Sequence, residues 1–172
     1  MAAAAPPDVT VTVDAGAHFL AVMPYWPVRE PLGLLISNGL ATMGFALPAA
    51  IGAGRPGRPV LCLTGDGGLG MTLAELETLA RLRLPVTVVV FDDATLSLIR
   101  VKQRPGQGEA AAVRYETMDF AAIARAVGLE AAVAERAGEV TRLLDGGWDR
   151  PRLIDARIDP AAYAHLITTT RG

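Results

Sequence analysis

Short apolar runs recur along the chain between polar and glycine-containing stretches, and they predict the strands of a buried sheet. The runs are Val9–Gly16 (VTVTVDAG), Leu32–Ser37 (LGLLIS), Val60–Thr64 (VLCLT), Val86–Phe91 (VTVVVF), Glu130–Glu135 (EAAVAE) and Arg152–Asp159 (RLIDARID). Several are rich in β-branched residues, and the central runs lack the apolar–polar alternation of a strand with one wet face. Such runs are typical of parallel strands that helices cover on both sides.

Segments with helical patterns lie between these runs. Thr42–Gly54 is rich in small residues and predicts a buried helix, after which Gly54–Pro59 forms a turn. Thr72 and Glu75 have the spacing of a capping box. We therefore expect a helix to begin at Thr72, and Pro85 marks its end.

The last third of the chain adds a loop and two helices. Lys102–Met118 contains a Pro-Gly pair and predicts a loop, Asp119 and Gly128 have the residue types of a helix cap and a helix stop, and Ala137–Gly147 predicts another helix. The alternation of strands and helices predicts an α/β fold, a doubly wound, mostly parallel sheet with helices on both faces. We expect a single domain over residues 1–172, with residues 1–8 as a flexible tail.

Composition narrows the classes of function. The apolar fraction is 51%, the charged fraction 20% and the formal net charge -2, so neither a nucleic-acid footprint nor a polybasic membrane patch is present. Leu32–Gly54 is long and apolar, but Asn38, Pro48 and its glycines argue against a membrane span. The start of the chain lacks the pattern of a signal peptide, and Cys62 is the single cysteine. We expect a cytoplasmic protein with Cys62 buried in a strand.

The candidate chemistry lies in the turns that follow the strands, because ligands of such sheets bind beyond the carboxyl ends of the strands. Gly65, Gly67 and Gly68 allow several backbone N–H groups to approach one anion, such as a phosphate. Asp66 lies in the same turn and would repel that phosphate. A hard divalent cation that bridges Asp66 and Asp93 to phosphate oxygens resolves the conflict, and Mg²⁺ suits this role best.

Simpler explanations stay open for each motif. Gly-Asp-Gly is also an ordinary turn, and Asp92-Asp93 after a strand is often a helix cap or part of a solvated loop. Gly65–Gly70 (GDGGLG) also matches the G-x-G-x-x-G pattern of dinucleotide sites. In that interpretation Asp66 would face a pyrophosphate without a metal, and the acidic residue that binds the ribose would come a little late. The dinucleotide is therefore the runner-up ligand.

Longer motifs resemble one enzyme family. Leu63–Ile99 (LTGDGGLGMTLAELETLARLRLPVTVVVFDDATLSLI) resembles the thiamine diphosphate motif of acetolactate synthase and pyruvate oxidase type enzymes. DAGAH at residues 14–18 resembles the Gly-Gln-His turn of these enzymes, and SNGLATMGFALPAAIGA at residues 37–53 resembles their Gly-Thr-Met-Gly-Phe segment. The resemblance runs from about Val9 to Ile158, and it covers only the diphosphate-binding (PP) domain, which usually lies at the C-terminus of those enzymes.

The resemblance implies a role for each matching residue. The implied Mg²⁺ ligands are Asp66, Asp93 and the carbonyl of Thr95. The residues implied to bind thiamine diphosphate are His18, Ala41, Met43, Gly65, Gly67, Gly68, Thr95, Leu96 and Ser97. His18 and the amides around Gly67 and Gly68 would contact the diphosphate. The Ala41 carbonyl and the Met43 amide would hold the aminopyrimidine, and the Met43 side chain would bend the cofactor, which then attacks a 2-keto acid.

Some positions depart from the family pattern. Asp93 stands where the family usually has Asn and adds a negative charge to the metal site, Ser97 replaces a common glycine, and Lys102 replaces a tryptophan near the substrate in acetolactate synthases. The pyrimidine-binding (PYR) domain of the family, whose glutamate activates the cofactor, is missing. Glu30 and Glu109 fall in loops of the wrong domain, so we expect no catalytic residue of this kind in the chain.

Three interpretations follow. In the favoured one the chain, which starts at its own Met, is a separate PP subunit of a split 2-keto acid decarboxylase or carboligase, a lyase or transferase that needs a PYR-domain partner in a hetero-oligomer or a homodimer core. In the second it is the same domain cut from a longer chain. In the third it is a non-catalytic module that binds thiamine diphosphate or a nucleotide. The face around Leu40–Ala50 is a candidate partner interface or part of the core.

Overall fold

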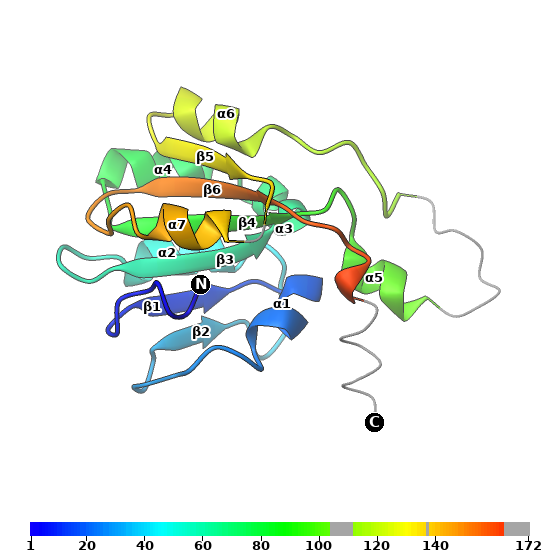
Figure 1. The fold of residues 1–172 in the computed structure, drawn as a ribbon, viewed down its shortest axis with the longest axis horizontal. Helices are drawn as coiled ribbons and strands as arrows, with labels where there is room; N and C mark the ends of the chain where they lie inside the picture. The colour runs from blue at the N-terminus through cyan, green and yellow to red at the C-terminus, as the bar shows by residue number, and fades with distance from the viewer. Residues whose placement is uncertain (104–111, 137, 164–172) are drawn as a thin grey trace.

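The computed structural model describes residues 1–103, 112–136 and 138–163, and these form one six-stranded sheet with helices (Figure 1). The strands are β1 (Thr10–Val13), β2 (Leu34–Ile36), β3 (Val60–Gly65), β4 (Val86–Asp92), β5 (Glu130–Ala134) and β6 (Arg152–Arg157). Their order in the sheet is β2-β1-β3-β4-β6-β5, and every pair is parallel. The predicted fold class is confirmed.

Helices cover both faces of the sheet (Figure 1). They are α1 (Ala17–Val22), α2 (Ala46–Ala53), α3 (Asp66–Met71), α4 (Glu75–Leu82), α5 (Ser97–Lys102), α6 (Phe120–Ala126) and α7 (Glu139–Leu144). Residues of α2, α3, α4 and α6 share one buried cluster with alternate strand residues such as Val60 and Cys62. Residues of α1 and α7 share the second cluster with the intervening ones, such as Leu61 and Leu63.

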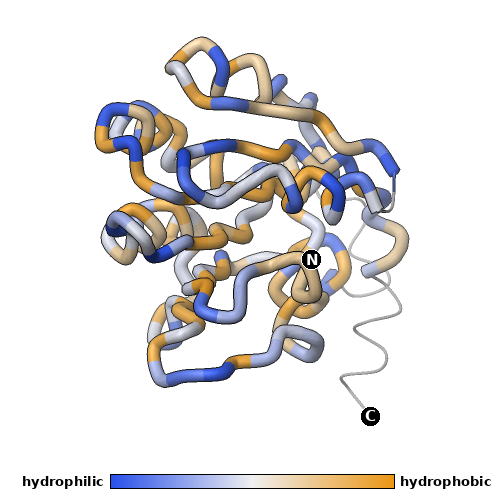
Figure 2. Tube along the Cα trace, turned by 60° about the vertical axis from the view of Figure 1, so that its left-hand side comes forward, coloured by the Kyte–Doolittle hydropathy of each residue, from blue (hydrophilic) through white to orange (hydrophobic). Residues whose placement is uncertain are grey.

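This alternation explains why the central runs are apolar throughout. Successive side chains of a strand point to opposite faces, and here each face has its own helical cover, so both sets are buried. Cys62 is fully buried, as predicted. The hydrophilic residues lie mainly on the outer turns (Figure 2).

Three short helices were not predicted from the sequence. α1, α3 and α5 follow β1, β3 and β4 directly, in places where only turns were predicted. Glycine lowers helix propensity, and α3 contains Gly67, Gly68 and Gly70, so local preference alone does not reveal it. Each of these helices starts at the carboxyl end of a strand, where the candidate chemistry lies.

The predicted capping box is wrong. Helix α4 begins at Glu75 rather than at Thr72, its N-cap Ala74 makes no side-chain cap, and the Thr72 hydroxyl donates instead to the Gly68 carbonyl at 3.5 Å. Thr72 is the C-cap of α3, so the unexpected short helix takes up the residue that would have started the longer one.

Other local predictions have mixed outcomes. The Asp119 cap is confirmed, because its carboxylate accepts from the Ala122 N–H at 2.8 Å. In the predicted loop Lys102–Met118, residues 104–111 lie outside the described residues. Met1 and Ala4 pack against the second cluster, and the mobility of residues 1–8 stays a prediction. No helix of the described ranges is long and apolar enough to cross a membrane.

The sheet topology places the candidate residues together. The strand order changes direction at β1, which pairs with β2 on one side and with β3 on the other. Register aligns Val13 with Leu63 and Gly65 with Phe91, so the segments after β1, β3 and β4 leave the same edge of the sheet. Such a switch point is where open α/β sheets bind ligands.

Candidate functional site

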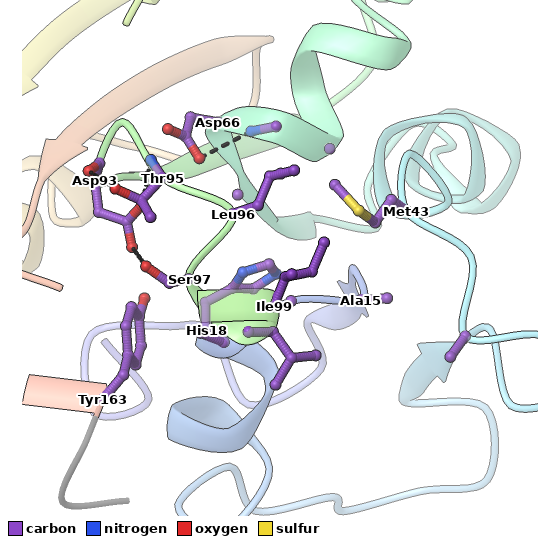
Figure 3. A pocket seen from close by; sticks show the side chains of 17 residues that line it. Ala15, His18, Met43, Asp66, Asp93, Thr95, Leu96, Ser97, Ile99 and Tyr163 are labelled. Atoms are coloured by element: carbon purple, nitrogen blue, oxygen red, sulfur yellow. Dashed lines mark hydrogen bonds between the residues drawn. The ribbon is translucent and has the colours of Figure 1, made fainter. Parts of the chain in front are cut away.

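A cavity of about 190 Å³ lies at this edge, beyond the carboxyl ends of β1, β3 and β4 (Figure 3). All the residues to which the sequence assigned a cofactor or metal role line it: His18, Ala41, Met43, Gly65, Asp66, Gly67, Gly68, Asp93, Thr95, Leu96 and Ser97. The structure therefore brings the predicted set to one place. Their individual roles stay predictions.

Asp14 organises the wall of this cavity, although no role was predicted for it. Its side chain is fully buried, and its carboxylate accepts hydrogen bonds from the N–H groups of Gly44 (2.9 Å) and Phe45 (3.0 Å). It also accepts from the Thr64 hydroxyl (2.9 Å) and the Ala15 N–H (3.1 Å). One carboxylate thus joins the end of β1, the end of β3 and the segment before α2.

The close approach of Asp14 also explains one glycine of the GDGG turn. A Cβ atom added at Gly68 would lie 2.1 Å from Oδ2 of Asp14 and 3.1 Å from the Thr64 hydroxyl. A Cβ atom at Gly67 would lie 2.9 Å from the Leu96 side chain and 3.3 Å from that of Met43. Steric demand for glycine is therefore stronger at Gly68 than at Gly67, where the nearest atoms belong to side-chain ends.

Asp66 and Asp93 form the acidic end of the cavity (Figure 3). Oδ1 of Asp66 accepts from the Gly67 N–H at 2.8 Å, whereas its buried Oδ2 has no hydrogen-bond partner among the described residues. Asp93 is half-buried and accepts from the Thr95 N–H at 2.9 Å and from the Ser97 hydroxyl at 2.6 Å. Ser97, which departs from the family glycine, therefore orients the other departing residue.

Burial and mutual repulsion shift the protonation of these acids. Burial, together with the charges of Asp93 and Asp92, raises the pKa of Asp66 to about 7, against hydrogen bonds from Gly67 and Tyr115 that lower it. Burial also raises the pKa of Asp93, against the hydrogen bonds from Ser97 and Thr95. A cation between the two carboxylates would relieve this repulsion.

Asp92, the neighbour of Asp93, has a different environment. It is buried, and its carboxylate pairs with the Arg157 guanidinium at 2.7 Å and accepts from the Thr117 hydroxyl at 2.6 Å. Arg157 also pairs with the buried Asp155 at 2.8 Å. Asp92 is thus committed to a structural ion pair, and only Asp93 of the Asp-Asp pair faces the cavity.

His18 supplies a buried imidazole to the cavity wall. Its ring stacks on Phe91, with centroids 5.5 Å apart and planes 13° apart, and its Nε2 atom has no partner in the described part of the chain. Burial lowers the pKa of His18 to about 4, so the ring is neutral at pH 7. Gly16 makes room for this ring, because a Cβ atom there would lie 2.5 Å from Cε1 of His18.

Met43 lies across the cavity from Asp93 (Figure 3), and Ala41, two residues before it, also lines the cavity. Ala41 has a left-handed backbone, with φ of 48°, and Gly44 has φ of 77°. The Ser37 hydroxyl accepts from the Thr42 N–H at 3.1 Å, and Asp14 holds Gly44, so the loop is fixed on both sides of Met43.

In the predicted interface Leu40–Ala50, Leu40 is exposed whereas Ala46, Leu47 and Ala50 belong to the core.

Sequence reasoning also missed two tyrosines near the acids. Tyr115 reaches the Asp66 carboxylate from a segment that pairs with the Asp93 loop, since the Tyr115 N–H donates to the Ala94 carbonyl at 3.1 Å. Tyr163 lines the cavity from the far C-terminal side. Neither lies in a motif or a periodic pattern, so no signal pointed to them. Asp14 was detectable, because it ends the first strand at the ligand-binding edge.

The residues present fit a metal-bound anion. The described residues contain no group of three or more His, Cys, Asp or Glu side chains arranged for a metal, so a cation here would need oxygens from backbone and ligand besides Asp66 and Asp93. The orphaned Oδ2 of Asp66 suits such a cation, and the orphaned Nε2 of His18 offers a polar contact to a ligand. Gly65, Gly67 and Gly68 line the same cavity.

Comparison with known proteins identifies the family. The profile described as "Thiamine pyrophosphate enzyme, C-terminal TPP binding domain" matches residues 14–156. The chain belongs to this family. The match favours the thiamine diphosphate interpretation of the GDGG turn over the dinucleotide one.

Relatives of this thiamine pyrophosphate enzyme domain include acetolactate synthases. The acetolactate synthase of Bacillus subtilis is 36% identical over 155 residues, which cover 88% of this chain and 27% of that enzyme. A probable acetolactate synthase large subunit of Methanococcus aeolicus is 34% identical over 166 residues, or 93% of this chain and 28% of the relative. The chain thus spans less than a third of the length of these relatives.

A solved structure has the same fold. The thiamine diphosphate-dependent 4-hydroxybenzoylformate decarboxylase of Rhodococcus jostii RHA1 superposes with a TM-score of 0.77 at 23% identity, over 92% of this chain and 31% of that one. At this identity the likeness concerns the fold. It supports the sheet topology described above.

Replacing Asp14 by Ala is expected to lower the free energy of unfolding by about 3 kcal/mol or more, because the buried N–H groups of Gly44 and Phe45 and the Thr64 hydroxyl lose their acceptor together. Chemical denaturation measures the change. The exposed Asp8→Ala serves as a control and should stay within about 0.5 kcal/mol of wild type. Equal stability of the Asp14 variant and wild type would contradict the role assigned to Asp14.

The raised pKa of Asp66 predicts a specific pH dependence of stability in EDTA. The folded state holds a proton on Asp66 between pH 4 and 7 that the unfolded state has lost, so this group costs stability as pH rises to about 7. Asp66→Asn should therefore gain stability over wild type, on the order of 2 kcal/mol at pH 8 and near zero at pH 4.

Denaturation of both proteins across this range measures the difference. His18 acts in the opposite sense, because its lowered pKa costs stability as pH falls below about 6.5, but it is common to both proteins and cancels. A difference that does not change with pH would show that Asp66 titrates normally.

Proposed function

We propose that this chain is the PP part of a thiamine diphosphate-dependent 2-keto acid decarboxylase or carboligase, a lyase or transferase, and that it binds Mg²⁺ and the diphosphate of the cofactor. The observation that carries the proposal is the pair of orphaned buried atoms, Nε2 of His18 and Oδ2 of Asp66, at family motif positions in one cavity. A structural turn would leave neither atom without a partner at a cavity wall.

Asp66 and Asp93 would hold the cation, together with the Thr95 carbonyl. The proximity of the two carboxylates and the raised pKa of each support this assignment, since a divalent cation stabilises the ionised form of both. Ser97 fixes the Asp93 carboxylate by its 2.6 Å hydrogen bond, and this contact would keep one Asp93 oxygen in place whether or not the cation is bound.

The remaining cavity residues would bind the organic cofactor. Gly65, Gly67 and Gly68, with Leu96 and Ser97 on the facing loop, would surround the diphosphate with backbone N–H groups, and His18 would contact the same group. At the other end the Ala41 carbonyl and the Met43 amide would orient the aminopyrimidine, with the Met43 side chain against the middle of the cofactor.

When bound, thiamine diphosphate supplies an electron sink for cleavage of the bond between the carbonyl and carboxyl carbons of a 2-keto acid. The chain's own residues bind and orient: Met43 sets the shape of the site, and Leu96 and Ile99 provide apolar walls that exclude water. The described cavity lining contains no glutamate that could take the role of the family's activating glutamate.

A PYR-domain partner would supply that glutamate. Glu30 is exposed and pairs with Arg58, Glu109 lies outside the described residues, and the described lining contains no glutamate. The cavity of about 190 Å³ is also smaller than the 300–1,000 Å³ that is usual for small-molecule pockets, so this chain would enclose only part of the cofactor. We propose a hetero-oligomer or a homodimer core in the cytoplasm.

A non-catalytic module is the alternative. Asp93 in the place of the family Asn favours it, because the extra charge repels the diphosphate and changes the balance of the metal site. The Ser97 and Thr95 hydrogen bonds to Asp93 weaken this argument, since they hold the carboxylate in a defined position within the cavity wall.

Calorimetric titration with thiamine diphosphate and Mg²⁺ tests the cofactor site. Wild type should bind, and binding should fall at least ten-fold in EDTA or in Asp66→Ala, because the cation loses one of its two carboxylates. Glu77→Ala, an exposed acid on α4, is the matched control and should bind like wild type.

The Asp93→Asn variant tests whether the carboxylate at this position is the reason for any failure of wild type to bind the cofactor. Binding by this variant but not by wild type would favour the non-catalytic alternative, with Asp93 as the cause. Binding that is insensitive to EDTA would contradict the metal-bridged site.

Turnover tests the partner requirement. The chain alone should release no measurable CO₂ from pyruvate or another 2-keto acid in the presence of cofactor and Mg²⁺, whereas addition of a PYR-domain chain should give turnover. The same mixture with Asp66→Ala, or with the activating glutamate of the partner replaced by Gln, is the control and should be inactive. Turnover by the chain alone would contradict the proposed division of the site.

A further inference from the structure

The C-terminal segment after β6 brings Tyr163 into the cavity. This segment leaves the sheet and reaches the neighbourhood of α5 (Figure 1). The Ile158 N–H donates to the Asp92 carbonyl at 2.9 Å, the Ala161 N–H donates to the Asp159 carboxylate at 2.8 Å, and the Tyr163 N–H donates to the Pro160 carbonyl at 3.2 Å. These bonds fix the path of the chain between the sheet and Tyr163.

Tyr163 is buried, but its hydroxyl is open to the cavity. Only 5% of the residue is exposed, and within the described residues its hydroxyl is neither hydrogen-bonded nor enclosed by protein, so it is open to the cavity. The ring lies at the acidic end of the cavity, and its hydroxyl points towards Ser97 and Asp93 (Figure 3). A phenol that is held in a cavity wall with its hydroxyl free to donate is suited to a ligand contact.

Other side chains at this end have their hydroxyl groups engaged. The Ser97 hydroxyl donates to the Asp93 carboxylate at 2.6 Å, and the Thr95 hydroxyl donates to the Asp93 carbonyl at 3.1 Å. Within the described lining, Tyr163 is therefore the hydroxyl that is left to donate to a ligand. Burial and the charges of Asp93 and Asp66 raise its pKa, so the hydroxyl keeps its proton.

We propose that the Tyr163 hydroxyl donates a hydrogen bond to an oxygen of the diphosphate that the acidic end of the cavity holds through its cation. The assignment rests on the proposed function above. Asp66 and Asp93 repel an anion, and the neutral His18 offers no positive charge, so a neutral donor beside them offsets part of that repulsion without competing for the cation. The C-terminal segment thereby completes a site that the strand-end motifs begin.

The variant Tyr163→Phe tests this contact, because it removes the hydroxyl and keeps the ring. Calorimetric titration in excess Mg²⁺ measures binding of thiamine diphosphate and of inorganic pyrophosphate, which lacks both rings. We expect the dissociation constants of both to rise by about ten-fold or more, which is typical of a lost hydrogen bond to a charged group. Thermal unfolding without ligand should be unchanged.

Matched variants separate the hydroxyl from the ring. Tyr25→Phe, at a residue that is 74% exposed, should bind both probes like wild type. Tyr163→Ala should bind no better than Tyr163→Phe. If Tyr163→Phe binds within two-fold of wild type, or weakens thiamine diphosphate but not pyrophosphate, the contact with the diphosphate is overturned.

The same titrations distinguish the two proposals. Binding by wild type that is lost in Asp66→Ala but kept in Tyr163→Phe overturns the Tyr163 contact and leaves the proposed function standing. Failure of wild type to bind either probe contradicts the proposed cofactor site, and the Tyr163 contact fails with it.

Discussion

The buried carboxylate of Asp14 is the constraint on which the cavity depends. It lies at the switch point of the sheet and accepts hydrogen bonds from the end of β3, from its own strand end and from the N–H groups before α2. It also excludes any side chain at Gly68, because a Cβ atom there would lie 2.1 Å from Oδ2 of Asp14. The position of the Met43 loop and the path of the GDGG turn are therefore coupled through one side chain. A buried carboxylate with this many donors is stable only in one arrangement of its neighbours, so the geometry of the two ends of the cavity is set together.

The acids at the end of β4 divide into two functions because the strand ends between them. Asp92 is the last residue of β4, is buried, and is neutralised by Arg157. Asp93 is the first residue beyond the strand and turns to the cavity, where Ser97 and Thr95 orient it. The ion pair of Asp92 holds the strand end to β6, and this fixes the position from which Asp93 reaches towards Asp66. Two adjacent residues of one chemical type thus have different surroundings, because Asp92 is held in an ion pair and Asp93 lines the cavity.

Much of the fold was predictable because its strands are apolar on both faces and its helices alternate with them. The strand runs were located within a few residues of their observed bounds, as for Val60–Gly65 and Val86–Asp92. The short helices α1 and α3 were not, since each has only six residues and α3 contains three glycines, which have low helix propensity. In the site, residues within motifs were predicted and come together, whereas Tyr115 and Tyr163 arrive from loops far along the chain. Only the folded path of the backbone brings such residues to a cavity, and no local pattern encodes it.

The charge distribution of the cavity bears on the proposal that a second domain completes the site. Asp66, Asp93 and a neutral His18 make one end suitable for a cation and, through it, for a diphosphate, while the Ala41–Met43 end is apolar and open. A chain that held a proton donor beside these acids would have to bury further charge in the same small space, at a cost in desolvation. Delivery of that donor by a second domain, as proposed, would avoid this cost, because the two charged sets would meet only with the cofactor and its cation between them. The same logic applies to Tyr163: a neutral hydroxyl is the kind of donor that this end of the cavity accommodates without another charge.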